Sequence, residues 1–153
     1  MPIESRPAAD PEIDALVTAQ QRELREADGG LDGQATVTHD DIRYLAVVVN
    51  GRAVACGGIQ ALDAGSGELK RMYVVPAYRG RGIARRLLTA LEELAAQQGH
   101  AEVRLETGTY LPAACALYTS SGYEPIPVYG EYVGNPYSAC FAKRLPRARP
   151  PQT

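Results

Sequence analysis

A strand, a glycine-containing turn and a long amphipathic helix follow one another between residues 68 and 98. Apolar residues at helical spacing predict the helix, and Gly99 lies where a C-terminal cap is expected: Ile83, Ala84, Leu87, Leu88, Leu91, Leu94 and Ala95. The next segment, residues 101–107, alternates apolar and charged positions as a strand does. Two strands joined by a helical crossover lie parallel in one sheet, so this unit restricts the fold class to α/β.

The remaining segments add antiparallel strands and further helices. The expected order is a helix at residues 10–29, a hairpin of strands 42–49 and 53–60, a short helix at 112–122, and strands at 123–128 and 137–145. Asp10 and Pro11 are typical of a helix start, and Asn50-Gly51 supplies the positive φ angles of a tight turn. Residues 28–41 are expected to form a surface loop or a poorly packed second helix.

One domain is expected, because 153 residues and 16.4 kDa suffice for one core but not for two. Its predicted extent is residues 1–145, and the Pro- and Arg-rich tail at 146–153 is expected to be disordered. A formal net charge of −2 argues against a general nucleic-acid binder. Because no long apolar stretch or apolar leader is present, we expect a cytoplasmic protein without a membrane span.

The cysteines and histidines do not suggest a metal site. Cys56, Cys115 and Cys140 cannot all pair with one another, and they indicate a reducing compartment. His39 and His100 have no second ligand at metal-binding spacing. We therefore expect no metal cofactor.

The turn before the long helix is predicted to bind phosphate. Arg79, Gly82 and Ala84 fit the pattern Arg/Gln-x-x-Gly-x-Gly/Ala. The first N–H groups of a helix lack partners within it, and the helix dipole adds partial positive charge there. The turn is neither a P-loop nor a dinucleotide fingerprint, because the residues that define those motifs are absent or misplaced. Arg85 and Arg86 add basic charge, or simply form a solvated helix face.

A second motif lies in the segment Leu105-Glu-Thr-Gly-Thr-Tyr-Leu-Pro-Ala-Ala-Cys-Ala-Leu-Tyr-Thr-Ser-Ser-Gly-Tyr123. It is similar to the Ala-x-x-Leu-Tyr-x-x-x-Gly-Phe signature of the GNAT acyltransferase family, whose coenzyme A loop the phosphate-binding turn resembles. The resemblance spans roughly residues 42 to 145 and includes Glu68-Leu-Lys-Arg-Met-Tyr-Val74. It implies a mixed, strongly twisted central sheet with flanking helices and a splayed parallel strand pair, into which acetyl-CoA enters as the acyl donor.

The resemblance also implies which residues contact acetyl-CoA. They are Met72, Tyr73, Val74, Arg79, Gly80, Arg81, Gly82, Ile83 and Ala84. The first three would supply backbone N–H groups for the thioester carbonyl and the pantetheine arm. Leu111 stands where many family members have an asparagine that contacts the cofactor.

Acyl transfer from a thioester to an amine needs a base, an oxyanion stabiliser and an acid for the departing thiolate. Tyr118 matches the family's acid, although a tyrosine in a helix also commonly packs against a sheet. At ordinary pKa values its proton transfer is uphill by about 1.5 units, or about 2 kcal/mol. Glu68 and Glu106 are the candidate bases, or surface carboxylates in salt bridges. Cys115 is expected to pack within its helix rather than to form an acyl intermediate.

We therefore expect an N-acetyltransferase that moves an acetyl group from acetyl-CoA to a primary amine, most simply of a small molecule, in a ternary complex. Tyrosines and Glu131 in residues 129–137, with Asp40 and Asp41, would select a cationic amine or merely form a polar loop. Alternatives are a non-catalytic acetyl-CoA-binding module, an enzyme acting on a protein N-terminus or lysine, and a nucleotide binder. A homodimer is left open.

Overall fold

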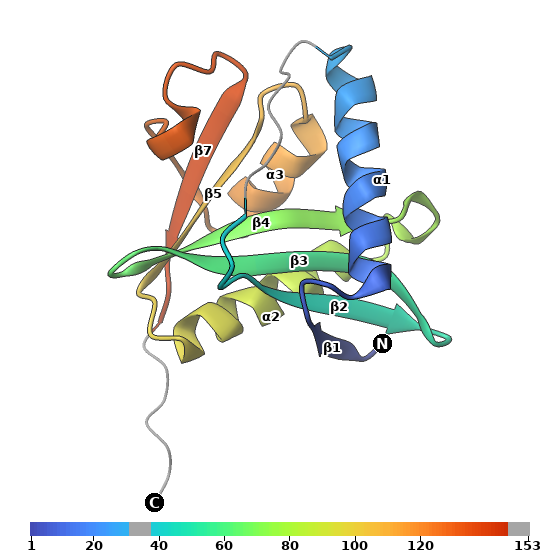
Figure 1. The fold of residues 1–153 in the computed structure, drawn as a ribbon. Helices are drawn as coiled ribbons and strands as arrows, with labels where there is room; N and C mark the ends of the chain where they lie inside the picture. The colour runs from blue at the N-terminus through green and yellow to red at the C-terminus, as the bar shows by residue number, and fades with distance from the viewer. Residues whose placement is uncertain (31–37, 147–153) are drawn as a thin grey trace, which may run out of the picture.

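A computed structural model of the protein describes residues 1–30 and 38–146. Within these ranges, seven strands form one mixed sheet in the order β1-β2-β3-β4-β5-β7-β6 (Figure 1). The strands are β1 (Ile3–Arg6), β2 (Arg43–Val49), β3 (Arg52–Asp63), β4 (Ser66–Val74), β5 (Glu102–Gly108), β6 (Glu124–Ile126) and β7 (Ser138–Arg144). The helices are α1 (Pro11–Asp28), α2 (Ile83–Gln97) and α3 (Pro112–Ser120), with 3-10 turns η1 (Pro76–Tyr78) and η2 (Gly130–Tyr132). The predicted α/β fold with a mixed central sheet is confirmed.

Helix α1 begins where the sequence predicts. Asp10 accepts a hydrogen bond from the backbone N–H of Ile13 at 3.1 Å, and Pro11 is the first helical residue. Gly29 ends the helix with a φ of 67°, in the left-handed region that glycine adopts readily. None of the helices in the described ranges is long and apolar enough to cross a membrane.

The predicted hairpin is also present, with positive φ at Asn50 and Gly51 between β2 and β3. Strand β1 is not predicted, because four residues are too few to show a period; it forms by antiparallel pairing with β2. Strand β6 is shorter than expected. Residues 31–37, part of the segment predicted as a loop or second helix, and residues 147–153 of the predicted tail lie outside the described residues.

The sheet separates two layers of helices. Helix α1 crosses one face over β3 and β4, and α2 covers the opposite face (Figure 1). Leu87 and Leu91 of α2 are fully buried in the larger core, whereas Ile13 and Leu16 of α1 pack near Tyr73 in a smaller one. Each such side chain contributes about 1.5–3 kcal/mol by its burial. Strand β4 is therefore covered by different helices on its two faces.

Strands β4 and β5 are paired at one end only. Parallel pairing joins Ser66–Glu68 to Glu102–Arg104, and beyond these residues the two strands diverge (Figure 1). A register shift between β3 and β4 falls at Arg71, whose φ is 58°, and such bulges bend a strand. The predicted crossover and splayed parallel pair are thus both confirmed.

Candidate active site

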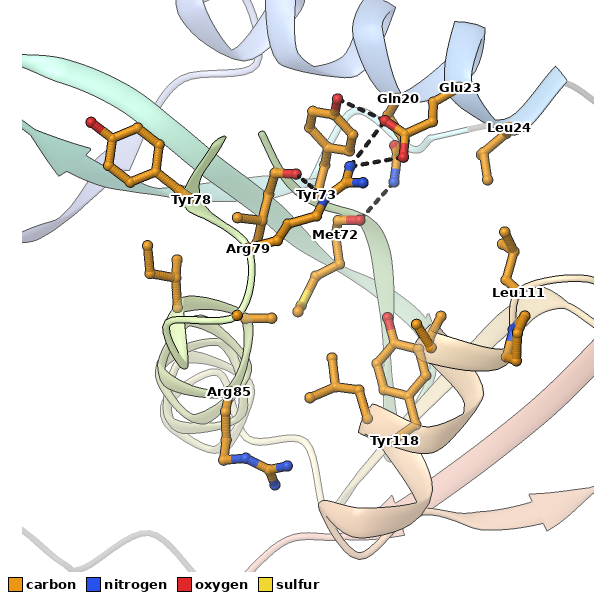
Figure 2. Close-up of a pocket in the computed structure, with 18 of the residues that line it drawn as sticks. Gln20, Glu23, Leu24, Met72, Tyr73, Tyr78, Arg79, Arg85, Leu111 and Tyr118 are labelled. Carbon is orange, nitrogen blue, oxygen red and sulfur yellow. Dashed lines mark hydrogen bonds and ion pairs between the residues drawn. The ribbon is translucent and has the colours of Figure 1, made fainter. Parts of the chain in front are cut away.

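A cavity of about 550 Å³ lies beside the diverging end of β4 (Figure 2). Five segments line it: α1, the end of β4, the turn that follows, the first residues of α2, and α3. All of the predicted cofactor-binding residues except Arg81 line this cavity, and so do Tyr118 and Leu111. Glu68 and Glu106 do not. The cavity therefore unites the two sequence motifs.

The edge of β4 beside the cavity has an alternating backbone pattern. Val75 donates its N–H to the carbonyl of Val54 in β3 at 3.0 Å, and Tyr73 is likewise paired with β3. Because backbone groups alternate along a strand, Met72 and Val74 turn theirs toward the diverging side. Of the three predicted backbone donors, the register thus directs Met72 and Val74 away from β3, and Tyr73 toward it.

Side chains from two other elements bind the carbonyls of this edge. Gln20 of α1 donates from Nε2 to the Met72 carbonyl at 2.7 Å, and Arg79 donates from Nε to the Val74 carbonyl at 2.9 Å (Figure 2). With these two acceptors engaged, the edge is left to offer backbone N–H donors. Such donors suit a ligand's carbonyl oxygen.

The guanidinium of Arg79 points toward α1 rather than away from the protein (Figure 2). It lies 2.8 Å from the Glu23 carboxylate and over the ring of Tyr73, 5.5 Å from its centroid. The Tyr73 hydroxyl donates to the same carboxylate at 3.0 Å, and burial, followed by this hydrogen bond, raises the pKa of Tyr73. The side chain of Arg79 is therefore engaged within the protein.

The turn before α2 presents backbone N–H groups. Gly80 and Gly82 adopt φ angles of 78° and 77°, and no side chain caps the helix at Gly82. The first hydrogen bond of the helix runs from the Arg86 N–H to the Gly82 carbonyl, so the N–H groups of residues 83–85 have no acceptor within the helix. Residues 83–85 all line the cavity. Open amides at a helix N-terminus suit a phosphate.

Other arginine side chains of this turn also have partners in the protein. Arg81 lies over the ring of Tyr78, 5.0 Å from its centroid, and is the one predicted cofactor-binding residue outside the cavity lining. Arg85 donates to the hydroxyls of Ser120 and Ser121 at the end of α3. The positive character of the turn thus comes from backbone amides together with these nearby guanidiniums.

Tyr118 reaches the cavity from α3. Its ring packs edge-on against Tyr123, with centroids 5.7 Å apart, and tilted against Phe141 at 6.4 Å. The side chain extends from α3 toward β4 (Figure 2). Burial, and to a lesser extent Cys115, raises the pKa of Tyr118 above its usual value, so the hydroxyl keeps its proton at neutral pH. Tyr118 can therefore donate a hydrogen bond into the cavity, and its raised pKa makes it a weaker acid than an exposed tyrosine.

Glu68 lies within a buried polar network on the α1 side of the sheet. It is 3% exposed and accepts hydrogen bonds from Gln60 Nε2 at 3.0 Å, the Tyr129 hydroxyl at 2.7 Å and the Tyr132 hydroxyl at 3.3 Å. Lys70 Nζ is 3.8 Å from the same carboxylate. These bonds and the nearby ammonium provide the buried carboxylate with the partners that its burial requires.

Lys70 connects this network to the loop before β7. Its ammonium donates to the Tyr132 hydroxyl at 2.7 Å and to Glu131 at 3.3 Å, although Lys70 itself is only 4% exposed. Burial first, and Glu68 second, raises the pKa of Tyr129 and of Tyr132. Both tyrosines therefore stay protonated and serve as donors. With two carboxylates and one ammonium, the network has a net negative charge.

Glu106 is on β5 and accepts a hydrogen bond from the Ser138 hydroxyl of β7. It is paired across the sheet with Cys140, whose thiol pKa is raised first by burial and also by Glu106 and Glu68. The two candidate bases thus both raise the pKa of the same thiol. They lie on the neighbouring strands β4 and β5, and neither lines the cavity.

Sequence reasoning missed the contributions of Gln20 and Glu23. Both lie on the cavity face of α1. In the sequence, such polar positions are typical of the solvent-facing side of an amphipathic helix. Lys70 was also missed, because a single lysine in a strand carries no motif. Two tyrosines of the loop at 129–137, which the sequence suggests as acceptor-selecting residues, lie with Lys70 around Glu68.

The sequence profile of the acetyltransferase (GNAT) family matches residues 10–123. The chain belongs to this family. It is thus an acetyl-CoA-dependent N-acetyltransferase, as the two motifs indicate. It is 40% identical over 112 residues to a protein named IAA acetyltransferase from Azospirillum brasilense, with 72% of each chain covered.

Solved structures agree with this assignment. The fold is similar to that of a proposed acyl-CoA N-acyltransferase from Klebsiella pneumoniae, with a TM-score of 0.82, 34% identity, and coverage of 94% of this chain and 97% of that one. A PaiA N-acetyltransferase from Thermoplasma acidophilum, solved with coenzyme A, shares the fold at a TM-score of 0.70 and 16% identity, with 94% and 99% covered. Among the described residues of this chain, no group of three or more metal-ligating side chains occurs.

Proposed function

We propose that the protein transfers an acetyl group from acetyl-CoA to the primary amine of a small molecule, directly and in a ternary complex. One observation carries the proposal: a single cavity joins the open N-terminus of α2, the edge of β4 and Tyr118. These are the parts needed to bind a pyrophosphate, to polarise a thioester carbonyl and to protonate a thiolate.

The donor would bind along the cavity from the turn toward α3. The backbone of residues 79–84 would receive the pyrophosphate, because its amides are open and its two positive-φ glycines leave room around the backbone. The N–H groups of Met72 and Val74 would bind carbonyl oxygens of the thioester and the pantetheine arm. Tyr118 would donate a hydrogen bond to the sulfur as it leaves, since its hydroxyl is protonated at neutral pH. Its raised pKa makes full proton transfer more uphill than at the ordinary value, so the bound donor would have to lower that pKa.

The base would be Glu68 or Glu106. Since neither lines the cavity, the proton would travel by a relay rather than by direct contact. Tyr129 is half-buried and donates to Glu68, so it could take the proton of the amine while passing its own to the carboxylate. Glu106 accepts a hydrogen bond from the Ser138 hydroxyl, which would be the corresponding relay group.

A small cationic acceptor fits the charge of this region. The network of Glu68, Lys70 and Glu131 has one more carboxylate than ammonium groups, which favours a cation nearby. Lys70 and Arg104 already lie over the rings of Tyr132 and Tyr129, so the carboxylates rather than the rings would attract the amine. The name of the Azospirillum relative also supports a small molecule. An acceptor on a protein and a non-catalytic acetyl-CoA-binding module are the alternatives. Location in the cytoplasm and dimer formation stay predictions.

The test is thiol release from acetyl-CoA over a panel of small amines, polyamines, amino acids and peptides. Release with a small amine, lost in Tyr118→Phe, supports the proposal. Turnover confined to peptides would replace the small molecule with a protein acceptor. Tight coenzyme A binding in calorimetry, without turnover on any amine, would favour the non-catalytic module.

A further inference from the structure

Helix α1 contributes one face to the cavity, formed by Gln20, Glu23, Leu24 and Ala27 at helical spacing. Gln20 is the residue of this face that touches the backbone of the splayed strand. Its Nε2 donates to the Met72 carbonyl at 2.7 Å (Figure 2). The amide thereby binds the strand edge where a ligand lying along β4 would otherwise place its own N–H.

The orientation of the Gln20 amide follows from this bond. If the amide were turned over, Oε1 would face the Met72 carbonyl oxygen, and two acceptors would meet without a hydrogen. Oε1 is therefore directed away from that carbonyl. Among the described residues, it is the one buried side-chain nitrogen or oxygen that has no hydrogen-bond partner. Buried polar atoms without partners are rare and destabilise the fold, so this one calls for an explanation.

We propose that Gln20 is a ligand-binding residue that accepts a hydrogen bond from an N–H group of a bound substrate. The inference rests on the proposed function in that both substrates carry such groups: the pantetheine amides of acetyl-CoA and the amine of the acceptor. A carbonyl or a phosphate cannot satisfy Oε1, because each is itself an acceptor.

The Gln20 amide would connect the Met72 carbonyl to a ligand N–H group through two successive hydrogen bonds. The Met72 carbonyl accepts from Nε2, and Oε1 of the same amide is a buried acceptor of a residue that lines the cavity. Hydrogen bonds in such a chain polarise one another, which strengthens the outer acceptor. The last torsion of a glutamine is broad, so the amide can adjust to a ligand without moving α1.

The alternative explanation is that the hydrogen bond of Gln20 only stabilises the packing of α1 on β4. Two variants separate these roles. Gln20→Met removes both hydrogen bonds at similar volume, and Gln20→Arg keeps a donor for the Met72 carbonyl but supplies no acceptor. Gln97→Met is the matched control, because Gln97 is exposed in the last turn of α2 and does not line the cavity.

Calorimetry with coenzyme A forms the first arm of the test, and it needs no acceptor. If a pantetheine amide is the donor, both Gln20 variants should bind coenzyme A about tenfold more weakly, as expected for one lost hydrogen bond, while Gln97→Met binds normally. An analogue with the pantetheine amide N–H replaced by oxygen should bind the wild type more weakly, yet lose nothing further in Gln20→Met.

The second arm compares kinetics with an amine found by thiol release. If the acceptor's amine is the donor, the variants should keep their coenzyme A affinity and show a KM for the amine about tenfold higher. The proposal is overturned if Gln20→Arg matches the wild type both in coenzyme A affinity and in the KM for the amine. If no amine turns over, an unchanged coenzyme A affinity in Gln20→Arg is enough to overturn it. Failure of the proposed function appears separately, as wild-type protein without turnover.

Discussion

Glu23 and Arg79 form an ion pair across 56 positions of sequence, with 2.8 Å between the carboxylate and the guanidinium. The pair joins α1 to the turn before α2, and both side chains line the cavity. Arg79 is the basic residue of the predicted phosphate-binding motif, yet it also donates to the Val74 carbonyl. The pair thus links one wall of the cavity to the segment proposed to bind pyrophosphate.

We expect Arg79→Met to weaken coenzyme A binding by less than tenfold, because the guanidinium is engaged by Glu23 and Val74 while the backbone amides of the turn remain. Calorimetry with coenzyme A provides the measurement. Glu23→Gln is the companion variant, and it should change the free energy of unfolding by no more than about 1 kcal/mol, as for other half-exposed ion pairs. A hundredfold loss in Arg79→Met would show that its side chain binds the phosphate directly.

Gly82→Val should abolish measurable coenzyme A binding, because a branched side chain would crowd the open amides at the start of α2. Gly82 has a φ of 77°, and a Cβ built there meets no protein atom within 4 Å. The substitution therefore strains the backbone without a clash in the free protein. Calorimetry measures the binding.

Gly51→Val is the matched control for that strain. Gly51 lies in the β2–β3 turn with the same φ of 77° and also has open space around it. Both valine variants should lose similar unfolding free energy, but Gly51→Val should bind coenzyme A normally. Equal coenzyme A affinities in the two variants would show that the pyrophosphate does not bind at this turn.

Much of the fold around the cavity can be predicted from local sequence patterns. Asp10 and Pro11 predict the start of α1, and the apolar stripe of α2 with the glycines before it predicts the turn. Short-range patterns suffice there because capping and helical burial involve neighbours along the chain. The crossover rule then gives the parallel pair.

The rest depends on contacts between distant residues. Gln20 bonds Met72 across 52 positions, and the direction of Arg79 is set by a carboxylate on another helix. No local pattern encodes either contact, since each requires the packing of α1 on the sheet. Strand β1 is likewise defined by its partner β2 rather than by its own four residues. The burial of Glu68 could not be foreseen because its two tyrosine donors come from a loop more than 60 positions away.

Tyr118→Phe should lower kcat at least tenfold, equivalent to about 1.4 kcal/mol, and leave acetyl-CoA affinity nearly unchanged. The hydroxyl would act on the leaving thiolate, whereas the ring makes the packing contacts that phenylalanine preserves. Steady-state kinetics with a good amine, together with calorimetry, measures both quantities. Tyr123→Phe is the control, since that hydroxyl binds Glu92 and does not line the cavity. Equal kcat values in wild type and Tyr118→Phe, with chemistry limiting, would remove Tyr118 from the reaction.

Stability should fall as the pH rises above about 9 to 10. Burial raises the pKa of Tyr118, Tyr123, Tyr129 and Tyr132 above the usual value, and raises the pKa of the Cys56 thiol to about 12. In the unfolded chain these groups lose their protons near pH 8.5 to 10, at their ordinary pKa values of about 8.5 and 10. The folded state then binds more protons, so raising the pH favours unfolding.

Urea unfolding between pH 8 and 11 measures this dependence. The contribution of the tyrosines is fully present below about pH 10 and is lost as the pH approaches their folded pKa values. Tyr123→Phe should make the decline shallower, because one such group is removed. An unfolding free energy that stays constant to pH 11 would contradict the burial of these hydroxyls.

The choice between Glu68 and Glu106 as base can be decided by pH profiles. Replacing the true base with glutamine should lower kcat/KM for the amine at neutral pH, with partial recovery as the pH rises, because solvent then deprotonates the ammonium. We expect the larger effect for Glu68→Gln, since the half-buried Tyr129 connects that carboxylate to the region outside the network. Glu93→Gln, on the exposed side of α2, should have the wild-type profile.

Glu68→Gln also removes a buried partner of Lys70, so its kinetics must be separated from a loss of folding. Coenzyme A affinity provides that check, because Glu68 does not line the cavity and a folded variant should bind normally. Tyr129→Phe interrupts the proposed relay without changing the charge of the network, and it should reproduce the pH-dependent loss of rate. If Tyr129→Phe and both glutamine variants retain the wild-type profile, the proton leaves by another route, for which the half-exposed Glu131 beside Lys70 is the next candidate.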